Sequence, residues 1–277
     1  MRAKKFSEWM NEGFQFEPDS SGNYKYINCK LTTLEGAPES VSGAFDCSSN
    51  SLMTLEGAPE SVGGHFYCST NKLTSLEGAP ESVGRDFYCD SNRLTSLEGA
   101  PESVGGFNCS RNKLTTLEGA PESVGGHFDC QYNMLMSLVG APESVGGGFD
   151  CCYNSLTSLE GAPESVDGNF YCHNNMLTTL EGAPEKIVGN FSCNEFTIDR
   201  GKWGIEGWLE VLQTGTDKAK SLILTLLSED ELDKYFTEDP MRLHLLDGHP
   251  EIKKGVLKRT GIRDMSRLGR IIKTGLL

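Results

Sequence analysis

One repeat of about 21 residues runs through most of the chain and restricts the possible fold more than any other feature. The string L-T-x-L-E-G-A-P-E begins at six leucines, and close variants begin at Leu52 and Leu135. The six leucines are Leu31, Leu73, Leu94, Leu114, Leu156 and Leu177. Successive copies are 21 residues apart, except for one step of 20 before Leu114, where a residue is missing ahead of Phe107. A fixed period of this length predicts a solenoid, in which each coil packs on its neighbours.

A second motif, F-x-C-x-x-N-x-L, lies between these strings; in one coil it is formed by Phe66, Cys68, Asn71 and Leu73. The two motifs together resemble the leucine-rich repeat, L-x-x-L-x-L-x-x-N-x-L, with Phe and Cys in two of the leucine positions. The short period and the proline are most similar to the repeats of about 20–22 residues in bacterial type III effectors. The resemblance covers residues 27–196. It implies an α/β repeat solenoid with a short parallel strand in each coil.

The residue types of the second motif predict which side chains point inward. Phe, Cys, Asn and Leu are expected to face the core, and the Asn amides to satisfy backbone groups left unpaired by the turn. The expected Asn ladder consists of Asn50, Asn71, Asn92, Asn112, Asn133, Asn154 and Asn175. The Gly-Ala-Pro segment suits an extended, polyproline-like return. The Val that follows is expected to fill the core.

Nine of the ten cysteines are expected to share one position of the repeat. They are Cys29, Cys47, Cys68, Cys89, Cys109, Cys130, Cys151, Cys172 and Cys193. A column of small buried groups needs no further role. A zinc site would need clustered ligands such as C-x-x-C, which the sequence lacks. We therefore expect no metal or cofactor. Free thiols favour a reducing compartment, hence the cytoplasm. Cys152 lies outside the column and is expected at the surface, with a reactive thiol as the alternative.

Charge is distributed unevenly along the chain, whose formal net charge is −14. Residues 27–196 carry 7 basic and 22 acidic side chains, whereas residues 250–277 carry 8 basic and 2 acidic ones. The repeat region is therefore expected to repel nucleic acids and anionic membranes, and only the C-terminal segment can attract them. The sequence contains no run of 18 apolar residues, so we expect no membrane span.

The positions that vary between coils predict a binding face. The residues around Phe and Cys that do not point inward are expected to project onto the concave sheet, where solenoids usually bind. Tyrosines among Asp, Asn, Ser and His resemble a protein-recognition surface, although variable positions can also simply lack constraint. The expected partner-binding residues are Tyr67, Tyr88, Asp90, Asn108, Arg111, Asp129, Gln131, Tyr132, Asp150, Tyr153, Tyr171 and His173.

The two ends depart from the repeat. Residues 1–26 have helix-like aromatic spacing and predict an N-terminal cap. The stretch from Lys4 to Glu12 resembles the N-terminus of many proteins of large tailed bacteriophages, which implies a phage origin and, in some cases, prohead targeting. Residues 197–277 predict an all-α domain. Its helices are expected at 203–212, 217–227, from the capping box at Ser228, at 239–248, 250–260 and 264–274.

The last two of these helices carry basic residues beside apolar ones. Such a stretch can contact nucleic acid, a membrane surface or the acidic solenoid, or it can be a solvated face. The candidate anion-binding residues are Lys253, Lys254, Lys258, Arg259, Arg263, Arg267 and Arg270.

The sequence offers no catalytic constellation. Effector ligases with similar repeats use a cysteine nucleophile in their C-terminal domain, and this chain has no cysteine after Cys193. No Walker A, G-x-S-x-G or H-E-x-x-H motif is present. We therefore expect a non-enzymatic, cytoplasmic protein that binds a protein partner on its concave face. If a phage encodes the chain, the expected partner is a host factor or a defence factor. The alternatives are a phage virion or prohead component, and nucleic-acid binding through the C-terminal helices.

Overall fold

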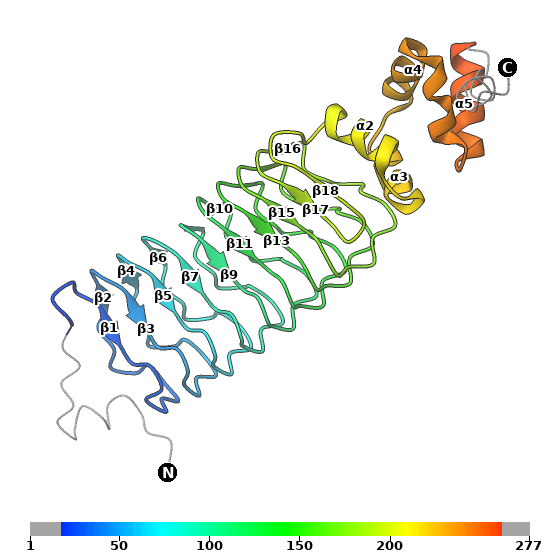
Figure 1. Cartoon of the computed structure of the whole chain (residues 1–277). Coiled ribbons are helices and arrows are strands. Elements are labelled where there is room, and N and C mark those ends of the chain that lie inside the picture. The colour runs from blue at the N-terminus through cyan, green and yellow to red at the C-terminus, as the bar shows by residue number, and fades with distance from the viewer. Residues whose placement is uncertain (1–17, 262–277) are drawn as a thin grey trace.

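A computed structural model describes residues 18–261, which form a parallel-strand solenoid followed by a helical C-terminal region (Figure 1). The predicted α/β repeat solenoid with an all-α C-terminal part is confirmed. The expected helical cap at the N-terminus falls largely outside the described residues.

One ten-stranded sheet runs the length of the solenoid. Each of its strands is only two residues long, because a turn follows the Phe-x pair in every coil. All neighbours pair in parallel except the last two strands, which are antiparallel. The strands, in spatial order, are β1 (Tyr24–Lys25), β3 (Phe45–Asp46), β5 (Phe66–Tyr67), β7 (Phe87–Tyr88), β9 (Phe107–Asn108), β11 (Phe128–Asp129), β13 (Phe149–Asp150), β15 (Phe170–Tyr171), β17 (Phe191–Ser192) and β18 (Thr197–Ile198).

The register of the first coil corrects one expectation about the cysteines. Tyr24 pairs with Phe45, so that Tyr26 takes the position that Cys47 has in the next coil. Cys29 is therefore equivalent to Asn50 and does not belong to the cysteine column. Cys29 is half-buried, whereas the eight cysteines of the column are buried. The sheet thus begins three residues before the first repeat recognisable in the sequence.

A continuous stack of phenylalanines forms the core behind this sheet. From Phe45 to Phe191, the rings of successive coils lie 5.1 to 5.8 Å apart between centroids. All eight are essentially inaccessible to solvent. The cysteine of each coil fills the space beside them, and two leucines and a valine close the coil. Burial of this apolar column, repeated coil after coil, stabilises the stack.

The asparagine ladder predicted from the sequence is present and joins each coil to its neighbours. In one coil, Oδ1 of Asn71 accepts a hydrogen bond from the Leu52 amide at 3.0 Å, and Nδ2 donates to the carbonyls of Cys47 and Cys68 at 3.1 Å. The same three contacts recur at the other ladder positions, for example at Asn92 and Asn154. Each ladder asparagine is thereby the partner of one buried backbone amide, and it shares two buried carbonyls with the asparagines of the neighbouring coils.

A second set of strands, which the sequence analysis did not predict, lies on the return side of the coil. Each is a Ser-Val pair or its equivalent, and its Val is buried. One sheet contains β2 (Ser40–Val41), β4 (Ser61–Val62) and β6 (Ser82–Val83). The other contains β8 (Ser103–Val104), β10 (Ser123–Val124), β12 (Ser144–Val145), β14 (Ser165–Val166) and β16 (Lys186–Ile187). The break falls between β6 and β8, at the coil that is one residue short.

A glycine in each coil is required by the close approach of its neighbour. Gly57 has φ of +83°, and a Cβ there would lie 2.8 Å from the backbone nitrogen of Glu35 in the preceding coil. A larger residue would suffer both the left-handed backbone and the steric overlap. The glycine of the E-G-A-P string therefore recurs among the coils for packing reasons, including the coil that has Val139 in place of the Glu.

The helical region packs on the last coil through its first two helices, α2 (Ile205–Thr214) and α3 (Asp217–Leu224) (Figure 1). Trp203, just before α2, continues the phenylalanine stack, with its ring 4.5 Å from that of Phe191. Its indole nitrogen donates to the Pro184 carbonyl at 2.9 Å, and Thr225 accepts from the Leu180 amide. These contacts cover the apolar end of the solenoid, which would otherwise be exposed.

The remaining helices form a smaller group beyond this cap. They are α4 (Glu229–Glu238), the 3-10 helix η1 (Pro240–Leu246) and α5 (Pro250–Thr260). The predicted capping box at Ser228 is present. An α-helix was expected where η1 lies; instead, the amides of Arg242, Asp247 and His249 bond to carbonyls three residues earlier. The helix expected at 264–274 lies outside the described residues. In the part that is described, no helix has the length and apolar character needed to cross a membrane.

Candidate binding face

The outward positions of the ten-stranded sheet form the candidate binding face. In the coils from β3 to β15, Phe and Cys are buried, while the residue between them is half-buried and points outward, as alternation along a strand requires; in β17 the equivalent residue, Ser192, is buried. We call this surface the sheet face; it consists of the outward residues of the ten-stranded sheet and the residues directly before and after each F-x-C motif.

Two tyrosines in neighbouring coils form the aromatic part of the sheet face. The rings of Tyr67 and Tyr88 stack with centroids 4.8 Å apart and planes 8° from parallel. The His65 ring lies 5.7 Å and 6.2 Å from them. The Tyr88 hydroxyl donates to Asp86 Oδ2 at 3.0 Å, and Nδ1 of His65 lies 3.3 Å from the same oxygen. These contacts hold the rings in place and leave part of each exposed.

A hollow lies beside this aromatic group, at the coil that is one residue short. Its volume is about 280 Å³, and its lining includes Asp86, Tyr88, Asn108, His127 and Asp129. The residue before Phe107 is Gly106, whereas the neighbouring coils place Asp86 and His127 at this position. The missing side chain opens the space, and a Cβ on Gly106 would lie 3.1 Å from Asp86 Oδ1. The hollow is therefore open because a glycine, and not an Asp or His as in the two neighbouring coils, precedes Phe107.

Carboxylates follow the hollow along the sheet face. Asp129 accepts from the Gln131 side chain at 3.0 Å. Burial raises the pKa of Asp129, an effect to which the nearby carboxylates of Asp150 and Asp90 add while the Gln131 hydrogen bonds oppose it. The Asp90 carboxylate in turn accepts from the Ser69 hydroxyl of the preceding coil. The middle of the sheet face is thus acidic and carries acceptors already oriented by neighbouring groups.

Tyr171 and His173 lie apart from the first aromatic pair. Three coils, which carry Asn108, Asp129 and Asp150 at the equivalent position, separate Tyr171 from Tyr88. Asn169 donates to the Tyr171 hydroxyl at 2.7 Å, and the Tyr171 and His173 rings are 6.3 Å apart. The structure therefore brings Tyr67 and Tyr88 together but not Tyr171.

Arg111, Tyr132 and Tyr153 were expected to project from the strands onto the concave sheet. Instead, they lie outside the strands. They lie in the bend after the sheet, each with φ of 55°. This left-handed backbone is uncommon for residues other than glycine, and it turns the side chains toward the side of the solenoid. The rings of Tyr132 and Tyr153 stack at 4.2 Å, and the Arg111 guanidinium lies over the Tyr132 ring at 4.8 Å.

Cys152 is buried, which corrects the expectation that it is exposed. Its amide donates to Asp150 Oδ1 at 2.9 Å. Burial and the Asp150 carboxylate raise the pKa of its thiol to about 12. A thiol that stays protonated at neutral pH is a poor nucleophile, so the structure argues against the reactive-thiol alternative.

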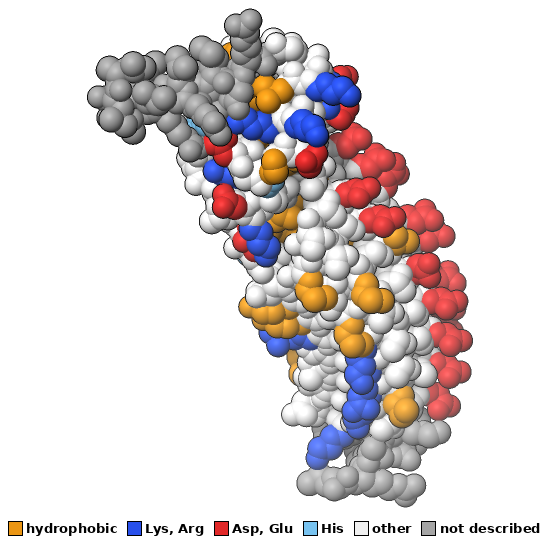
Figure 2. All heavy atoms as spheres, turned by 90° about the vertical axis from the view of Figure 1, so that its right-hand side faces the viewer, with side chains coloured by type: hydrophobic (Ala, Val, Ile, Leu, Met, Phe, Trp, Pro, Cys, Tyr) orange, Lys and Arg blue, Asp and Glu red, His pale blue; other side chains and the backbone are white. Residues whose placement is uncertain are grey.

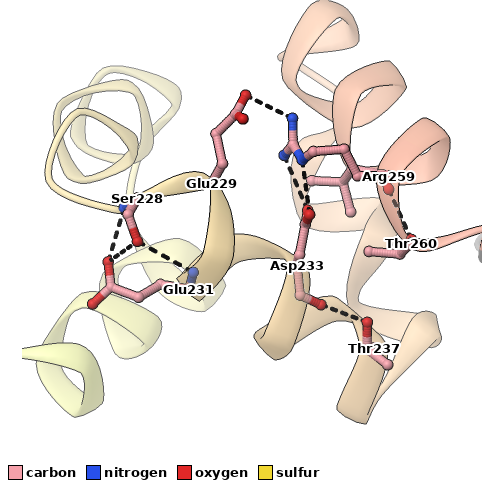
Figure 3. A network of polar contacts seen from close by, with 8 residues as sticks. Ser228, Glu229, Glu231, Asp233, Thr237, Arg259 and Thr260 are labelled. Atoms are coloured by element: carbon pink, nitrogen blue, oxygen red, sulfur yellow. Dashed lines mark hydrogen bonds and ion pairs between the residues drawn. The ribbon is translucent and has the colours of Figure 1, made fainter.

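Two of the candidate anion-binding residues form ion pairs within the helical region. Arg259 contacts Asp233 at 2.7 and 3.0 Å and Glu229 at 2.7 Å (Figure 3). Lys253 contacts Asp247 at 2.8 Å. Lys254 and Lys258 are exposed on α5, and Arg263, Arg267 and Arg270 lie outside the described residues. The described part of this basic segment is thus used, at two positions, to join α5 to its surroundings.

A further surface, which the sequence analysis largely missed, lies on the side of the solenoid (Figure 2). We call it the edge surface: the residue before each ladder Asn, the residue after it and the residue after the next Leu, with their equivalents in the first coil. Large apolar side chains are exposed on it at Met53, Tyr132, Met134, Met136, Tyr153 and Met176. A comparison of the coils would have revealed them, since other coils carry Ser, Thr, Lys or Arg at most of these positions.

Among residues 18–261, no three His, Cys, Asp or Glu side chains come together in a way that can hold a metal ion. The sequence matches no protein-family model, and no curated protein matches it either.

Proposed function

We propose that this chain is a non-enzymatic binding protein that captures a protein partner on its sheet face. The observation that carries the proposal is the Tyr67–Tyr88 stack beside the hollow at Gly106. Stacked, partly exposed tyrosines supply a large contact area at low entropic cost, and a concave site next to them can accept a protruding side chain.

The charge of the face indicates what kind of partner fits. Asp86, Asp90, Asp129 and Asp150 surround the hollow and its continuation, and Asn108 lies between them. A partner whose Lys or Arg side chains enter this region would gain electrostatic complementarity and contact with the Tyr88 ring. We therefore expect a partner with a basic patch, bound by a face that is apolar at one end and acidic in the middle.

The resemblance of the N-terminal stretch to tailed-phage proteins supports a narrower proposal, that a phage encodes the chain and that its partner is a host factor. No described residue bears on the alternative of a virion component. The alternative of nucleic-acid binding has less support, because Arg259 and Lys253 are engaged in ion pairs.

The test is a tagged capture from cell lysate with variants that alter the face but not the framework. Tyr67→Ala with Tyr88→Ala removes the aromatic pair, and Gly106→Asn fills the hollow with a residue that the same column carries at Asn169 and Asn190. Gly148→Asn is the matched control, since Gly148 occupies that column two coils away.

The expected result is one stoichiometric protein that the wild type and Gly148→Asn retain and that the other two variants lose. All variants should keep the melting temperature within a few degrees of the wild type, since the changed side chains are at the surface. If every variant captures the same proteins, the sheet face is not the binding surface and the proposal is wrong.

A further inference from the structure

The charges on the side of the solenoid are separated to an unusual degree. Of the 7 basic residues between positions 27 and 196, five lie on the edge surface: Lys30, Lys72, Arg93, Arg111 and Lys113. None of the 22 acidic residues of the same segment lies there. In Figure 2 a line of Lys and Arg side chains runs along the N-terminal half of the solenoid, with a line of acidic side chains along the adjoining ridge. The two lines share one side of the molecule.

Each line follows one column of the repeat. The residue after each ladder Asn supplies the cations Lys72, Arg93 and Lys113, and we call this column the cation stripe. The first Glu of the E-G-A-P string, five residues later, supplies Glu77, Glu98 and Glu118, and we call this column the Glu ridge. These six side chains belong to exposed residues, and none has an ion-pair partner within residues 18–261. Charges of opposite sign thus lie in parallel columns without being neutralised.

One coil departs from the pattern in both columns at once. Met134 stands in the cation stripe where the three preceding coils have Lys or Arg, and Val139 stands in the Glu ridge where every other coil has Glu. Their exposed fractions are 49% and 45%, and that of Met136 between them is 66%. If the two columns faced each other across an interface, a simultaneous loss of the cation and the acid would replace an ion pair by an apolar contact.

We propose that this side of the solenoid is an interface between two copies of the chain, related by a two-fold axis parallel to the solenoid. Such an axis exchanges left and right between the facing copies and keeps the order of the coils. The cation stripe of each copy then meets the Glu ridge of the other, coil by coil. A two-fold axis perpendicular to the solenoid would instead bring like stripes together, which costs energy.

The repeat itself explains why a second copy fits this surface. Coils stack at about 4.8 Å, close to the separation of parallel strands. The charges of a second solenoid have the same spacing, so that Lys72, Arg93 and Lys113 meet Glu77, Glu98 and Glu118 of the partner subunit in register. Met134 meets Val139 of the partner subunit in the next coil. The arrangement uses the same surface on both copies and therefore closes as a dimer.

Charge reversal tests this arrangement. One variant changes Lys72, Arg93 and Lys113 to Glu, and a second changes Glu77, Glu98 and Glu118 to Lys. Each variant alone places like charges opposite each other, whereas an equimolar mixture restores opposite charges on both stripes. The control reverses Arg85 and Lys186, which alters the net charge in the same direction as the first variant but leaves both stripes intact. Circular dichroism of every variant should match the wild type, because all these side chains are exposed.

Sedimentation equilibrium at low salt and high micromolar concentration provides the readout. The wild type and the control should sediment at twice the chain mass of 30.2 kDa, each reversed variant at the single mass, and their mixture at twice the mass again. High salt should weaken the dimer, since exposed charges are screened. A monomeric wild type, reversed variants that still dimerise, or a mixture that stays monomeric would each overturn the proposal. So would a wild type that is monomeric and binds an acidic peptide or a nucleic acid through the cation stripe.

Discussion

The buried cysteine column predicts that the protein loses stability steeply in mild alkali. Seven thiols, at Cys47, Cys68, Cys89, Cys109, Cys130, Cys151 and Cys172, are buried in the core. Burial is the main cause that raises the pKa of each of them above its ordinary value of 9.0. Each Sγ also donates a hydrogen bond to a carbonyl of the next coil, as Cys89 does to Asn108 at 3.3 Å. The folded state therefore keeps these thiols protonated.

The sign of the effect follows from the raised pKa values. Below pH 9 the thiols are protonated in both states, and the native environment contributes its full stabilisation. Above pH 9 the unfolded chain releases protons that the folded chain retains, so the free energy of unfolding falls as the pH rises. At pH 10, one unfolded thiol with a pKa of 9.0 shifts the equilibrium by about 1.4 kcal/mol. Seven thiols amount to roughly 10 kcal/mol, comparable with the whole stability of a typical domain.

Cys193 acts in the opposite direction over a lower range. Hydrogen bonding from Cys172 lowers the pKa of Cys193 to about 7. Its thiolate is favoured in the folded state, so Cys193 adds stability as the pH rises from 7 to 9 and adds nothing more above that. The net expectation is a modest gain up to about pH 8.5 and a steep loss beyond pH 9.

Urea unfolding in the presence of a phosphine reductant, repeated between pH 7 and pH 10.5, measures the effect. The slope of the unfolding free energy against pH gives the number of protons released on unfolding. We expect about seven or eight near pH 10, of which Cys152, whose pKa is also raised, contributes about one. Cys89→Ala should reduce this number by one, whereas Cys29→Ala, which changes a half-buried thiol outside the column, should reduce it by less. A slope of fewer than about two protons, or one that Cys89→Ala leaves unchanged, would refute the assignment of these thiols as buried and protonated.

Three further changes test other parts of the fold. Asn92→Ala leaves the Leu73 amide without its partner and removes one of the two asparagine hydrogen bonds that the carbonyls of Cys68 and Cys89 each accept. It should cost about 2 kcal/mol in urea unfolding, and a loss below about 1 kcal/mol would contradict the ladder. Trp203→Ala should cost about 3 kcal/mol and increase amide exchange in the last coil, and unchanged exchange there would show that the tryptophan does not cap the stack. Ser228→Ala removes the capping box and should destabilise α4 by about 1 kcal/mol, visible as faster amide exchange in its first turn and nowhere in the solenoid.

Much of the solenoid could be predicted from the sequence because its packing is local and periodic. The inward positions of Phe, Cys and Leu, the ladder at Asn71 and its equivalents, and the capping box at Ser228 follow from patterns within one coil or one helix. The rule that successive coils stack then gives the neighbours of each residue, such as Tyr67 beside Tyr88. The periodicity did not predict the paired Ser-Val strands, because a two-residue ladder leaves no alternating pattern to recognise.

The tertiary structure decided the features that depend on backbone dihedral angles or on contacts between distant segments. The left-handed bend at Tyr132 and Tyr153 moved them from the sheet face to the side of the solenoid, which residue type alone does not reveal. The burial of Cys152 depends on the neighbouring coils. The hollow at Gly106 arises from one absent side chain among three coils, and the pairing of Arg259 with Asp233 joins residues 26 apart in the sequence. A repeating sequence thus determines the repeating core, because each coil supplies its own inward contacts. At positions that depart from the repeat, the shape and exposure of the surface are determined only when the coils and helices are placed against one another.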